Sequence, residues 1–130
     1  MNVLLSIEAR YGEMIFSGQK KYEFRRKIFK EDPKKIYLYY NSDVQKIVGC
    51  FEPGGVLEGS PQAIWRKCGK NGGISREKFF EYFIGSETAF AILVKRPHKF
   101  TRSINPKNSI PNFFAPQSFR YLKRVWPKRP

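Results

Sequence analysis

Strand-like segments follow one another between residues 21 and 58 of this 130-residue chain, with no helical segment between them. Residues 21–26 alternate between aromatic and charged side chains, which is typical of a half-buried strand. Two further runs, at 35–40 and 45–51, are rich in aliphatic and aromatic residues, and Pro53-Gly54-Gly55 predicts a bend or bulge. Parallel neighbours need crossover connections of about a dozen residues, so this succession disfavours a doubly wound parallel sheet.

Capping residues predict three helices. Serine caps the free N–H groups at the beginning of a helix, proline fits the first turn, and glycine is a common stop. The predicted helices cover residues 8–16 with Gly18 as the stop, Ser60-Pro61 to Gly69, and Ser75 to Gly85. Tyr11, Met14 and Ile15 form an apolar stripe on the first helix, which we interpret as core packing.

The remaining segments predict strands at 3–7, 88–95 and 118–125. Residues 97–117 contain four prolines and little periodicity, so we expect a long basic loop there. This order of strands and helices indicates a small α+β domain built on a curved sheet or barrel. The length fits one domain, which we place at residues 1–125, followed by a basic C-terminal tail at 126–130.

Positive charge is distributed unevenly along the chain. The formal net charge is +14, from 25 Lys and Arg against 11 Asp and Glu. Residues 1–60 hold ten basic and eight acidic side chains, whereas residues 61–130 hold fifteen basic and three acidic ones, and no acid follows Glu87. Such asymmetry favours a polyanionic partner, because phosphates neutralise the charge and release counterions. We therefore expect nucleic acid binding; a basic surface with no specific partner is the alternative.

Rare residues argue against several kinds of site. His98 is the single histidine and lies in a basic segment, and Cys50 and Cys68 are far apart without a Cys-x-x-Cys pattern. Zinc sites therefore lack ligands, and histidine-based catalysis could use only His98, which its basic surroundings disfavour, so we expect no metal, no cofactor and two free thiols. The longest apolar run has six residues, against about 20 for a membrane span. We expect no transmembrane helix and, without a secretory signal pattern, a cytoplasmic location.

The segment from Gly18 to Arg26 has the most distinctive chemistry. Strand geometry places Glu23 and Arg25 on one face, about 7 Å apart along the strand. A carboxylate beside a guanidinium is held ionised, so it can accept from a nucleobase amine while nearby cations hold a phosphate or a carbonyl. An exterior strand face with one ordinary ion pair explains the pattern equally well.

Several motifs, in this order, resemble the ASCH domain family. They are Leu4-Leu5-Ser6-Ile7, the G-x-K-x-x-E-x-R pattern at Gly18, Lys20, Glu23 and Arg25, I-V-G-x-F at 47–51, E-G-S-P at 58–61 with a tryptophan soon after, G-I-S at 73–75, and Pro116-Gln117-Ser118-Phe119. The similarity covers nearly the whole chain. It implies a PUA-like curved or closed β-barrel of about five to six strands with flanking helices. It also implies that the G-x-K-x-x-E-x-R segment lines a cleft that holds RNA or a modified nucleoside.

Some members of this superfamily are enzymes, so catalysis is an alternative. One group removes the acetyl group from N4-acetylcytidine with a lysine, a threonine three residues on and a distant glutamate. Lys20 matches the lysine, but Glu23 stands at the threonine position and no acid lies near Asn71-Gly72, which argues against that chemistry. Other members are ribonucleases.

If the chain is an enzyme, either a metal-independent ribonuclease or an N4-acylcytidine-type amidohydrolase, Lys20 and Glu23 are its candidate catalytic residues. Strict alternation along the strand would put these two side chains on opposite faces. They can act together only if Lys20 lies in the turn before the strand or if a bulge resets the register.

RNA binding, by a mixed-charge cleft and a basic C-terminal flank, is our leading hypothesis. Tyr37 and Tyr39 lie on the face opposite Ile36 and Leu38, so base stacking and core packing are equally open for them. The candidate binding residues are Ser6, Lys20, Lys21, Glu23, Arg25, Arg26, Tyr37, Tyr39, Gln117, Ser118, Arg120, Lys123 and Arg124. A third hypothesis is a regulatory module whose basic face binds acidic protein surfaces. We expect a monomer.

Overall fold

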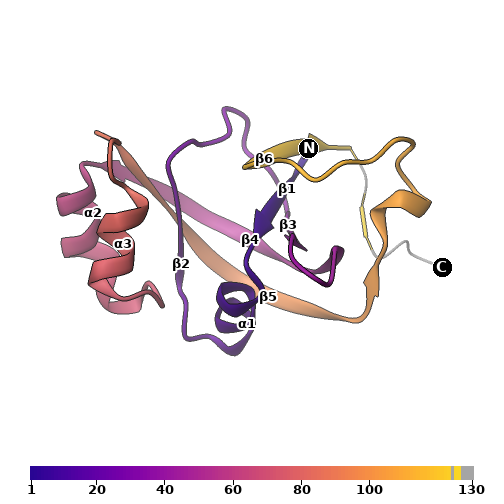
Figure 1. Cartoon of the computed structure of the whole chain (residues 1–130), viewed down its shortest axis with the longest axis horizontal. Coiled ribbons are helices and arrows are strands. Elements are labelled where there is room, and N and C mark those ends of the chain that lie inside the picture. The colour runs from indigo at the N-terminus through magenta and orange to yellow at the C-terminus, as the bar shows by residue number, and fades with distance from the viewer. Residues whose placement is uncertain (124, 127–130) are drawn as a thin grey trace.

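The computed structural model describes residues 1–123, 125 and 126 (Figure 1). Its strands are β1 (Asn2–Ile7), β2 (Tyr22–Arg25), β3 (Ile36–Tyr40), β4 (Lys46–Gly59), β5 (Ala89–Ile104) and β6 (Phe119–Leu122). Its helices are α1 (Ala9–Ser17), α2 (Pro61–Cys68) and α3 (Arg76–Tyr82), with short 3-10 turns η1 (Gly69–Asn71) and η2 (Pro106–Asn108). The predicted α+β domain on a curved sheet with flanking helices is confirmed.

The strands of the described chain form one curled sheet, a half-barrel, in the order β2-β5-β4-β3-β1-β6. Strands β1 and β3 pair in parallel, and the other neighbours are antiparallel. Strands β2 and β6 are therefore the two edges of the sheet. The curl brings these edges close to each other. Arg25 on β2 donates a hydrogen bond of 3.0 Å to the backbone oxygen of Ser118, the residue before β6. Side chains rather than a backbone ladder thus join the two edges along this seam.

The long strands β4 and β5 contain bulges that the sequence analysis anticipated only in part. Gly54 and Gly55 together face one residue of β5, as the predicted bend requires, and Gly55 has a φ of +117°. On the other strand, Arg96 and Pro97 together oppose the single residue Phe51. Because the proline lies in a bulge, the ladder loses little from its missing N–H. The expectation that residues 97–104 belong to a loop is therefore wrong; β5 continues to Ile104.

The predicted helix caps form as the sequence indicates. Gly18 ends α1 in the left-handed region with a φ of +87°. The side chain of Ser60 accepts a hydrogen bond from the backbone N–H of Ala63 at the beginning of α2, and Ser75 caps α3 in the same way. Helix α3 ends at Tyr82, earlier than the predicted Gly85.

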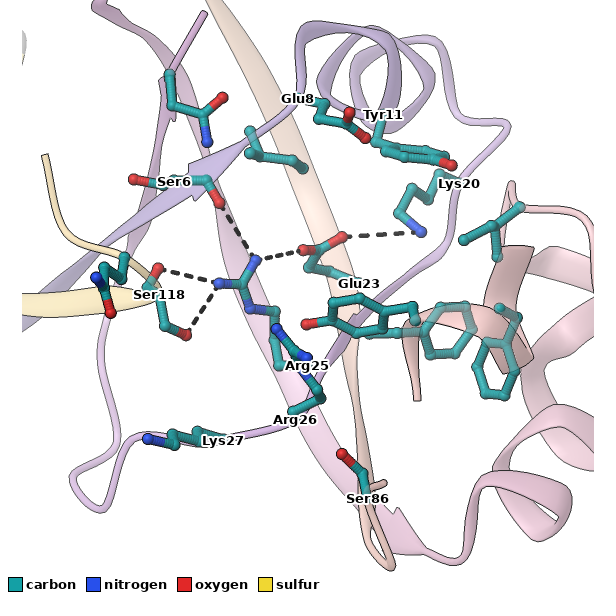
Figure 2. Close-up of a pocket in the computed structure, with 17 residues that line it drawn as sticks. Ser6, Glu8, Tyr11, Lys20, Glu23, Arg25, Arg26, Lys27, Ser86 and Ser118 are labelled. Atoms are coloured by element: carbon teal, nitrogen blue, oxygen red, sulfur yellow. Dashed lines mark hydrogen bonds and ion pairs between the residues drawn. The ribbon is translucent and has the colours of Figure 1, made fainter. Parts of the chain in front are cut away.

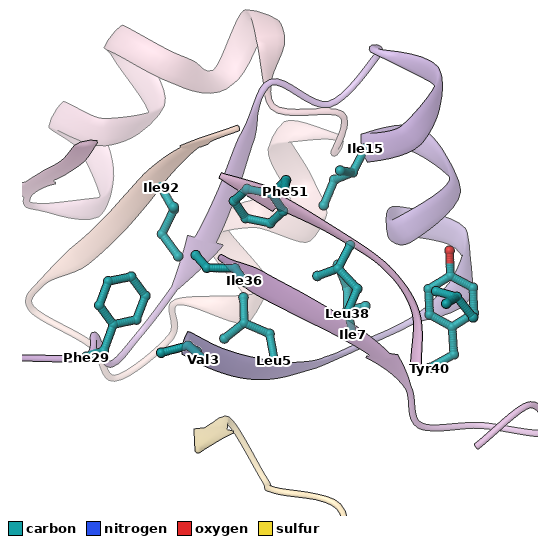
Figure 3. Close-up of a cluster of buried hydrophobic side chains, with 11 residues drawn as sticks. Val3, Leu5, Ile7, Ile15, Phe29, Ile36, Leu38, Tyr40, Phe51 and Ile92 are labelled. Atoms are coloured by element: carbon teal, nitrogen blue, oxygen red, sulfur yellow. The ribbon is translucent and has the colours of Figure 1, made fainter. Parts of the chain in front are cut away.

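Three apolar clusters hold the described fold together. The first lies between β1, β3 and α1 and includes Val3, Leu5, Ile15, Ile36 and Leu38 (Figure 3). The second packs against the opposite side of β1 and β3, through Leu4 and Tyr37. The third joins α2 and α3 to β2 and β5. None of the helices formed by the described residues is both long and apolar enough to cross a membrane.

Trp126 belongs to the second of these clusters. Its ring meets that of Tyr37 edge to face with centroids 5.3 Å apart, and its backbone N–H donates to the Tyr37 hydroxyl at 2.8 Å. Trp126 is 5% exposed. The first residue of the predicted basic tail is thus packed into the domain, while residues 127–130 lie outside the described part of the chain.

Candidate binding pocket at the seam of the sheet

Lys20 reaches the face of Glu23 because it lies in the turn between α1 and β2, not on the strand. Its backbone N–H donates to the carbonyl oxygen of Met14 at 3.0 Å, and its ammonium donates to the carbonyl oxygen of Gly72 at 2.6 Å. The turn packs closely on Gly73, which has a φ of +63° and where a Cβ would lie 2.8 Å from the Cβ of Lys20. Glycine at this position therefore lets the Lys20 side chain pack closely against the backbone at Gly72 and Gly73.

Glu23 lies between two cations (Figure 2). Its Oε1 is 3.7 Å from the Lys20 ammonium and its Oε2 is 3.1 Å from Nη1 of Arg25. Glu23 and Arg25 are on one face of β2, as the period of two predicts. Relative exposures of 3% for Lys20, 5% for Glu23 and 9% for Arg25 show that this is a buried ionic cluster. The alternative of an exposed strand face with one ordinary ion pair is therefore excluded.

Arg25 is a clamp between the first strand and the segment before β6. Its Nη1 donates to the carbonyl oxygen of Ser6 at 3.2 Å as well as to Glu23. Its Nη2 donates to the backbone and hydroxyl oxygens of Ser118, both at 3.0 Å. These contacts occupy all four Nη hydrogens of the guanidinium. Within the described structure, the buried Nε has no hydrogen-bond partner.

Two aromatic rings lie near the Lys20 ammonium. The ammonium nitrogen lies 4.8 Å from the ring centroid of Phe24 and 5.4 Å from that of Tyr11. Burial lowers the pKa of the Lys20 ammonium below its ordinary value, whereas the negative charge of Glu23 opposes this shift. The nearby charge of Arg25 lowers the pKa of Lys20 further. This combination is typical of sites that bind charged ligands or transfer protons.

The buried cluster forms the floor of a pocket of about 660 Å³. Its walls come from the ends of β1 and β2, the beginning of α1, helix α3 and the segment before β6. The lining residues are Ser6, Ile7, Glu8, Tyr11, Lys20, Glu23, Phe24, Arg25, Arg26, Lys27, Asn41, Ile74, Phe79, Tyr82, Ser86, Gln117 and Ser118. Arg26 and Lys27 are exposed cations, and the guanidinium of Arg26 lies 4.7 Å from the ring centroid of Tyr82.

Candidate residues from the sequence divide into two groups. The structure brings seven of them to the pocket: Ser6, Lys20, Glu23, Arg25, Arg26, Gln117 and Ser118. Lys21, Arg120 and Lys123 do not line it; Arg120 lies over the ring of Phe113, and Lys21 and Lys123 are exposed. Arg124 is outside the described residues.

Tyr37 and Tyr39 are core residues, not stacking platforms. Tyr37 is fully buried and Tyr39 is 5% exposed, and both pack in the second cluster. Strand β3 is central in the sheet and covered on both faces, so the side opposite Ile36 and Leu38 faces a second core and not solvent. Of the two alternatives left open by the sequence, the structure shows core packing.

Tyr11 and Tyr82 are pocket residues that the sequence analysis missed. Tyr11 belongs to the apolar stripe that the sequence analysis assigned to core packing, and Tyr82 lies on a helix for which it proposed no site residue. A ring that walls a pocket obeys the same helical period as a ring in a core, so the pattern alone has no signal that separates them. Glu8, Asn41 and Ser86 were missed because they lie at element ends with no motif. Among the described residues, no three His, Cys, Asp or Glu side chains are grouped closely enough to hold a metal ion.

A half-barrel closed by a buried ionic cluster next to a pocket defines a PUA-like domain of the ASCH type. The chain is 30% identical over 125 residues to an ASCH domain-containing ribonuclease of Zymomonas mobilis. The aligned region covers 93% of this chain and 84% of that protein. It therefore belongs to the ASCH domain family. The crystal structure of ASCH from Zymomonas mobilis matches 95% of this chain and 88% of that chain, with a TM-score of 0.88 and 27% identity.

Two further comparisons extend this picture. Part of the large ribosomal subunit protein uL22 of Ureaplasma parvum is 34% identical over 91 residues, which is 68% of this chain and 28% of that protein. The N-terminal domain of Staphylothermus marinus McrB shares the fold at 15% identity and a TM-score of 0.51, covering 85% of this chain and 81% of that chain. No family model matches the chain.

Proposed function

We propose that this ASCH domain binds single-stranded RNA and takes one nucleotide into the pocket at the seam. The observation that carries the proposal is the pocket itself, about 660 Å³ in volume, with the buried charges of Lys20, Glu23 and Arg25 at its floor. Ligand sites are concave and combine apolar walls with a few fixed polar groups. Buried polar groups that line an open pocket give such a site a means of recognition.

The walls and the mouth suit the two halves of a nucleotide. Single-stranded RNA is recognised when unstacked bases lie against aromatic rings or guanidinium planes. Tyr11 and Tyr82 line the pocket, and Arg26 stacks on Tyr82. Arg26 and Lys27 are exposed at the mouth and form no ion pair within the described part of the chain. They are therefore the groups that would contact phosphate, while the base enters between the rings.

The basic C-terminal flank would extend these phosphate contacts along a longer strand. Lys123 is exposed at the end of β6, and Arg120 is half-buried over Phe113. The relatives support an RNA ligand, because one is named a ribonuclease and another is a ribosomal protein.

Salt dependence of RNA binding tests this proposal. We expect labelled single-stranded RNA to bind with an affinity that falls steeply as salt rises, since each phosphate contact contributes about 0.7 to the log–log slope for a single strand. Replacing Arg26 and Lys27 together (R26Q/K27Q) should reduce that slope by about 1.4. Fluorescence anisotropy titrations at several salt concentrations measure both quantities.

The matched control removes two cations outside the pocket. Lys67 on α2 and Lys70 on η1 are exposed and do not line it, so K67Q/K70Q makes the same change in net charge. Its salt slope should stay close to that of the wild type. Absence of RNA binding, or equal slopes for the two double variants, would contradict the proposal.

Metal-independent cleavage of RNA is a second candidate function, favoured by the name of the Zymomonas relative and by the lowered pKa of Lys20. Neutral Lys20 would accept the proton of a ribose 2′-hydroxyl as its oxygen attacks the adjacent phosphorus. The bond to the 5′-oxygen breaks, that oxygen takes a proton from solvent, and a 2′,3′-cyclic phosphate forms. Glu23, whose Oε1 is 3.7 Å from Nζ of Lys20, would stabilise the ammonium that forms when Lys20 takes this proton.

Turnover of the Lys20→Met variant tests this candidate. We expect cleavage of RNA to fall by about 100-fold or more, and a 2′-deoxy substrate to resist the wild-type protein. Lys21→Met changes the exposed neighbour, which does not line the pocket, and should keep its turnover. Matching melting temperatures would show that the variants are folded. Unchanged cleavage by folded K20M would eliminate Lys20 as the base.

A further inference from the structure

The floor of the pocket is rich in hydrogen-bond acceptors although three of its residues are charged and two of those are cations. The reason is that the donor groups of Arg25 and Lys20 are already hydrogen-bonded or enclosed by other residues. All four Nη hydrogens of Arg25 are bonded to Glu23, Ser6 and Ser118. Its remaining Nε hydrogen is buried without a partner. Arg25 therefore offers a ligand positive charge at a distance but no Nη hydrogen to bond.

Lys20 is restricted by its surroundings and not by a full set of hydrogen bonds. Its ammonium donates to the carbonyl oxygen of Gly72 at 2.6 Å and faces Glu23 at 3.7 Å. The rings of Phe24 and Tyr11 cover two further sides of the ammonium, at 4.8 and 5.4 Å from their centroids. Lys20 is 3% exposed and Glu23 is 5% exposed, so each presents a small part of its surface to the pocket, and the two rings occupy part of the space beside Lys20.

Glu23 keeps unused acceptor capacity. An ionised carboxylate has about four lone-pair sites. Arg25 donates a hydrogen bond to Oε2, whereas the Lys20 ammonium is an ion-pair partner 3.7 Å from Oε1, and Figure 2 shows the two cations on the two sides of the carboxylate. Ser6 adds to the acceptors, because its hydroxyl donates its proton to the carbonyl oxygen of Pro116 at 2.7 Å and keeps its lone pairs. The free cations, Arg26 and Lys27, lie at the mouth instead.

We propose that this pocket selects nucleobases that carry an exocyclic amine, namely adenine, cytosine and guanine, and discriminates against uracil. The inference rests on the proposed RNA binding and names the class of base that the pocket takes. The amine donates to the fixed carboxylate of Glu23, whose orientation Lys20 and Arg25 maintain. Uracil has carbonyl oxygens on both sides of its single N3–H, so its edge would place an oxygen against the carboxylate.

Two pairs of matched ligands test the selection. Cytidine and uridine octamers have the same phosphates and the same ring size, so the salt-dependent part of their binding is common to both. Guanosine and inosine monophosphates differ only by the 2-amino group. We expect the ligand with the amine to bind about tenfold tighter in each pair. Isothermal titration calorimetry measures the dissociation constants at one fixed salt concentration.

The Glu23→Gln variant probes the acceptor directly. Its amide keeps one acceptor oxygen and adds an NH₂ donor that can bond a uracil carbonyl, so the preference for cytidine over uridine should fall to about twofold or less. Glu58→Gln removes a carboxylate from an exposed position on β4 outside the pocket and should retain the tenfold ratio. The ratio of two affinities reports selection, and a general weakening of binding cancels from it.

The possible outcomes distinguish failure of the amine selection from failure of the proposed RNA binding. If both octamers bind within twofold of each other to the wild-type protein, selection by the amine is wrong while RNA binding stands. If neither binds, the proposed function fails and the selection with it. If E23Q does not fold, as its melting curve would show, the wild-type ratios in the two ligand pairs still settle the question.

Discussion

Arg25 is the residue on which both the fold and the pocket depend. A guanidinium that is nine-tenths buried has lost most of its hydration, and an unpaired buried charge is strongly destabilising. Its contacts to Glu23, Ser6 and Ser118 compensate for that loss through four hydrogen bonds in the plane of one group. Lysine has a point charge and no planar fork, so it cannot reproduce this arrangement.

Replacing Arg25 by lysine should therefore destabilise the protein although it preserves the charge. We expect a loss of about 2–4 kcal/mol in the free energy of unfolding, because the buried carboxylate of Glu23 and the oxygens of Ser6 and Ser118 lose their hydrogen bonds from Arg25. The midpoint and slope of a urea titration measure this value.

The matched change is Arg26→Lys, one residue further along the chain. Arg26 is exposed and its described contact is the stacking on Tyr82, worth about 1 kcal/mol or less at such a site. Equal losses for R25K and R26K would show that the planar clamp is not what stabilises the seam.

At the scale of elements, α1 is attached to the sheet through Glu13. The carboxylate accepts from the Tyr40 hydroxyl of β3 at 2.5 Å and from the Lys99 ammonium of β5 at 2.7 Å. The helix thereby contacts two strands that are not neighbours in the sheet. The hydrogen bonds from Lys99 and Tyr40 lower the pKa of Glu13 below its ordinary value of 4.5, and burial opposes them.

This attachment should weaken in acid. Because the pKa of Glu13 is lower in the folded state, its contribution is complete above about pH 4.5 and disappears as the pH falls through the folded-state pKa. The pair with Lys99 is half exposed, so we expect Glu13→Gln to cost about 1 kcal/mol or less at pH 7. Near pH 3 the wild type and E13Q should differ by less, as chemical denaturation at the two pH values can measure.

Glu87→Gln is the control for Glu13. Glu87 is an exposed carboxylate that forms no ion pair within the described residues. Its substitution should change stability by about 0.5 kcal/mol or less at both pH values. A Glu13→Gln effect that is the same at pH 7 and pH 3 would contradict the linkage.

Elements were predicted best where their signal is local. Ser60, Ser75 and Gly18 act on backbone groups within a turn of their own position, and the structure has all three caps. Strand β5 was predicted too short because Pro97 is a local signal against a strand. The bulge that accommodates this proline depends on the partner residue Phe51, which is distant in sequence.

At the scale of the whole molecule, the pocket exists because the sheet curls. Strands β2 and β6 are the most distant strands in the sheet order, yet Arg25 and Ser118 are in hydrogen-bond contact. The floor of the pocket comes from this seam, and α3 supplies a further wall through Tyr82. The nearly balanced first half of the sequence contains the ionic cluster, and the acid-free stretch that follows Glu87 supplies β6 and the flanking cations.

The sequence by itself determined the α+β class, the caps, and the shared face of Glu23 and Arg25, because these depend on backbone periods of two and 3.6 residues. The sequence also contains the G-x-K-x-x-E-x-R motif, which includes Lys20 and resembles the ASCH family. The tertiary structure decided that Tyr37 and Tyr39 belong to the core and that Tyr11 and Tyr82 line the pocket. It also decided that Arg25 donates its hydrogen bonds to Ser6 and Ser118. Those outcomes depend on which face of each element is covered after the sheet curls, and local periodicity is the same for a covered core face and a pocket wall.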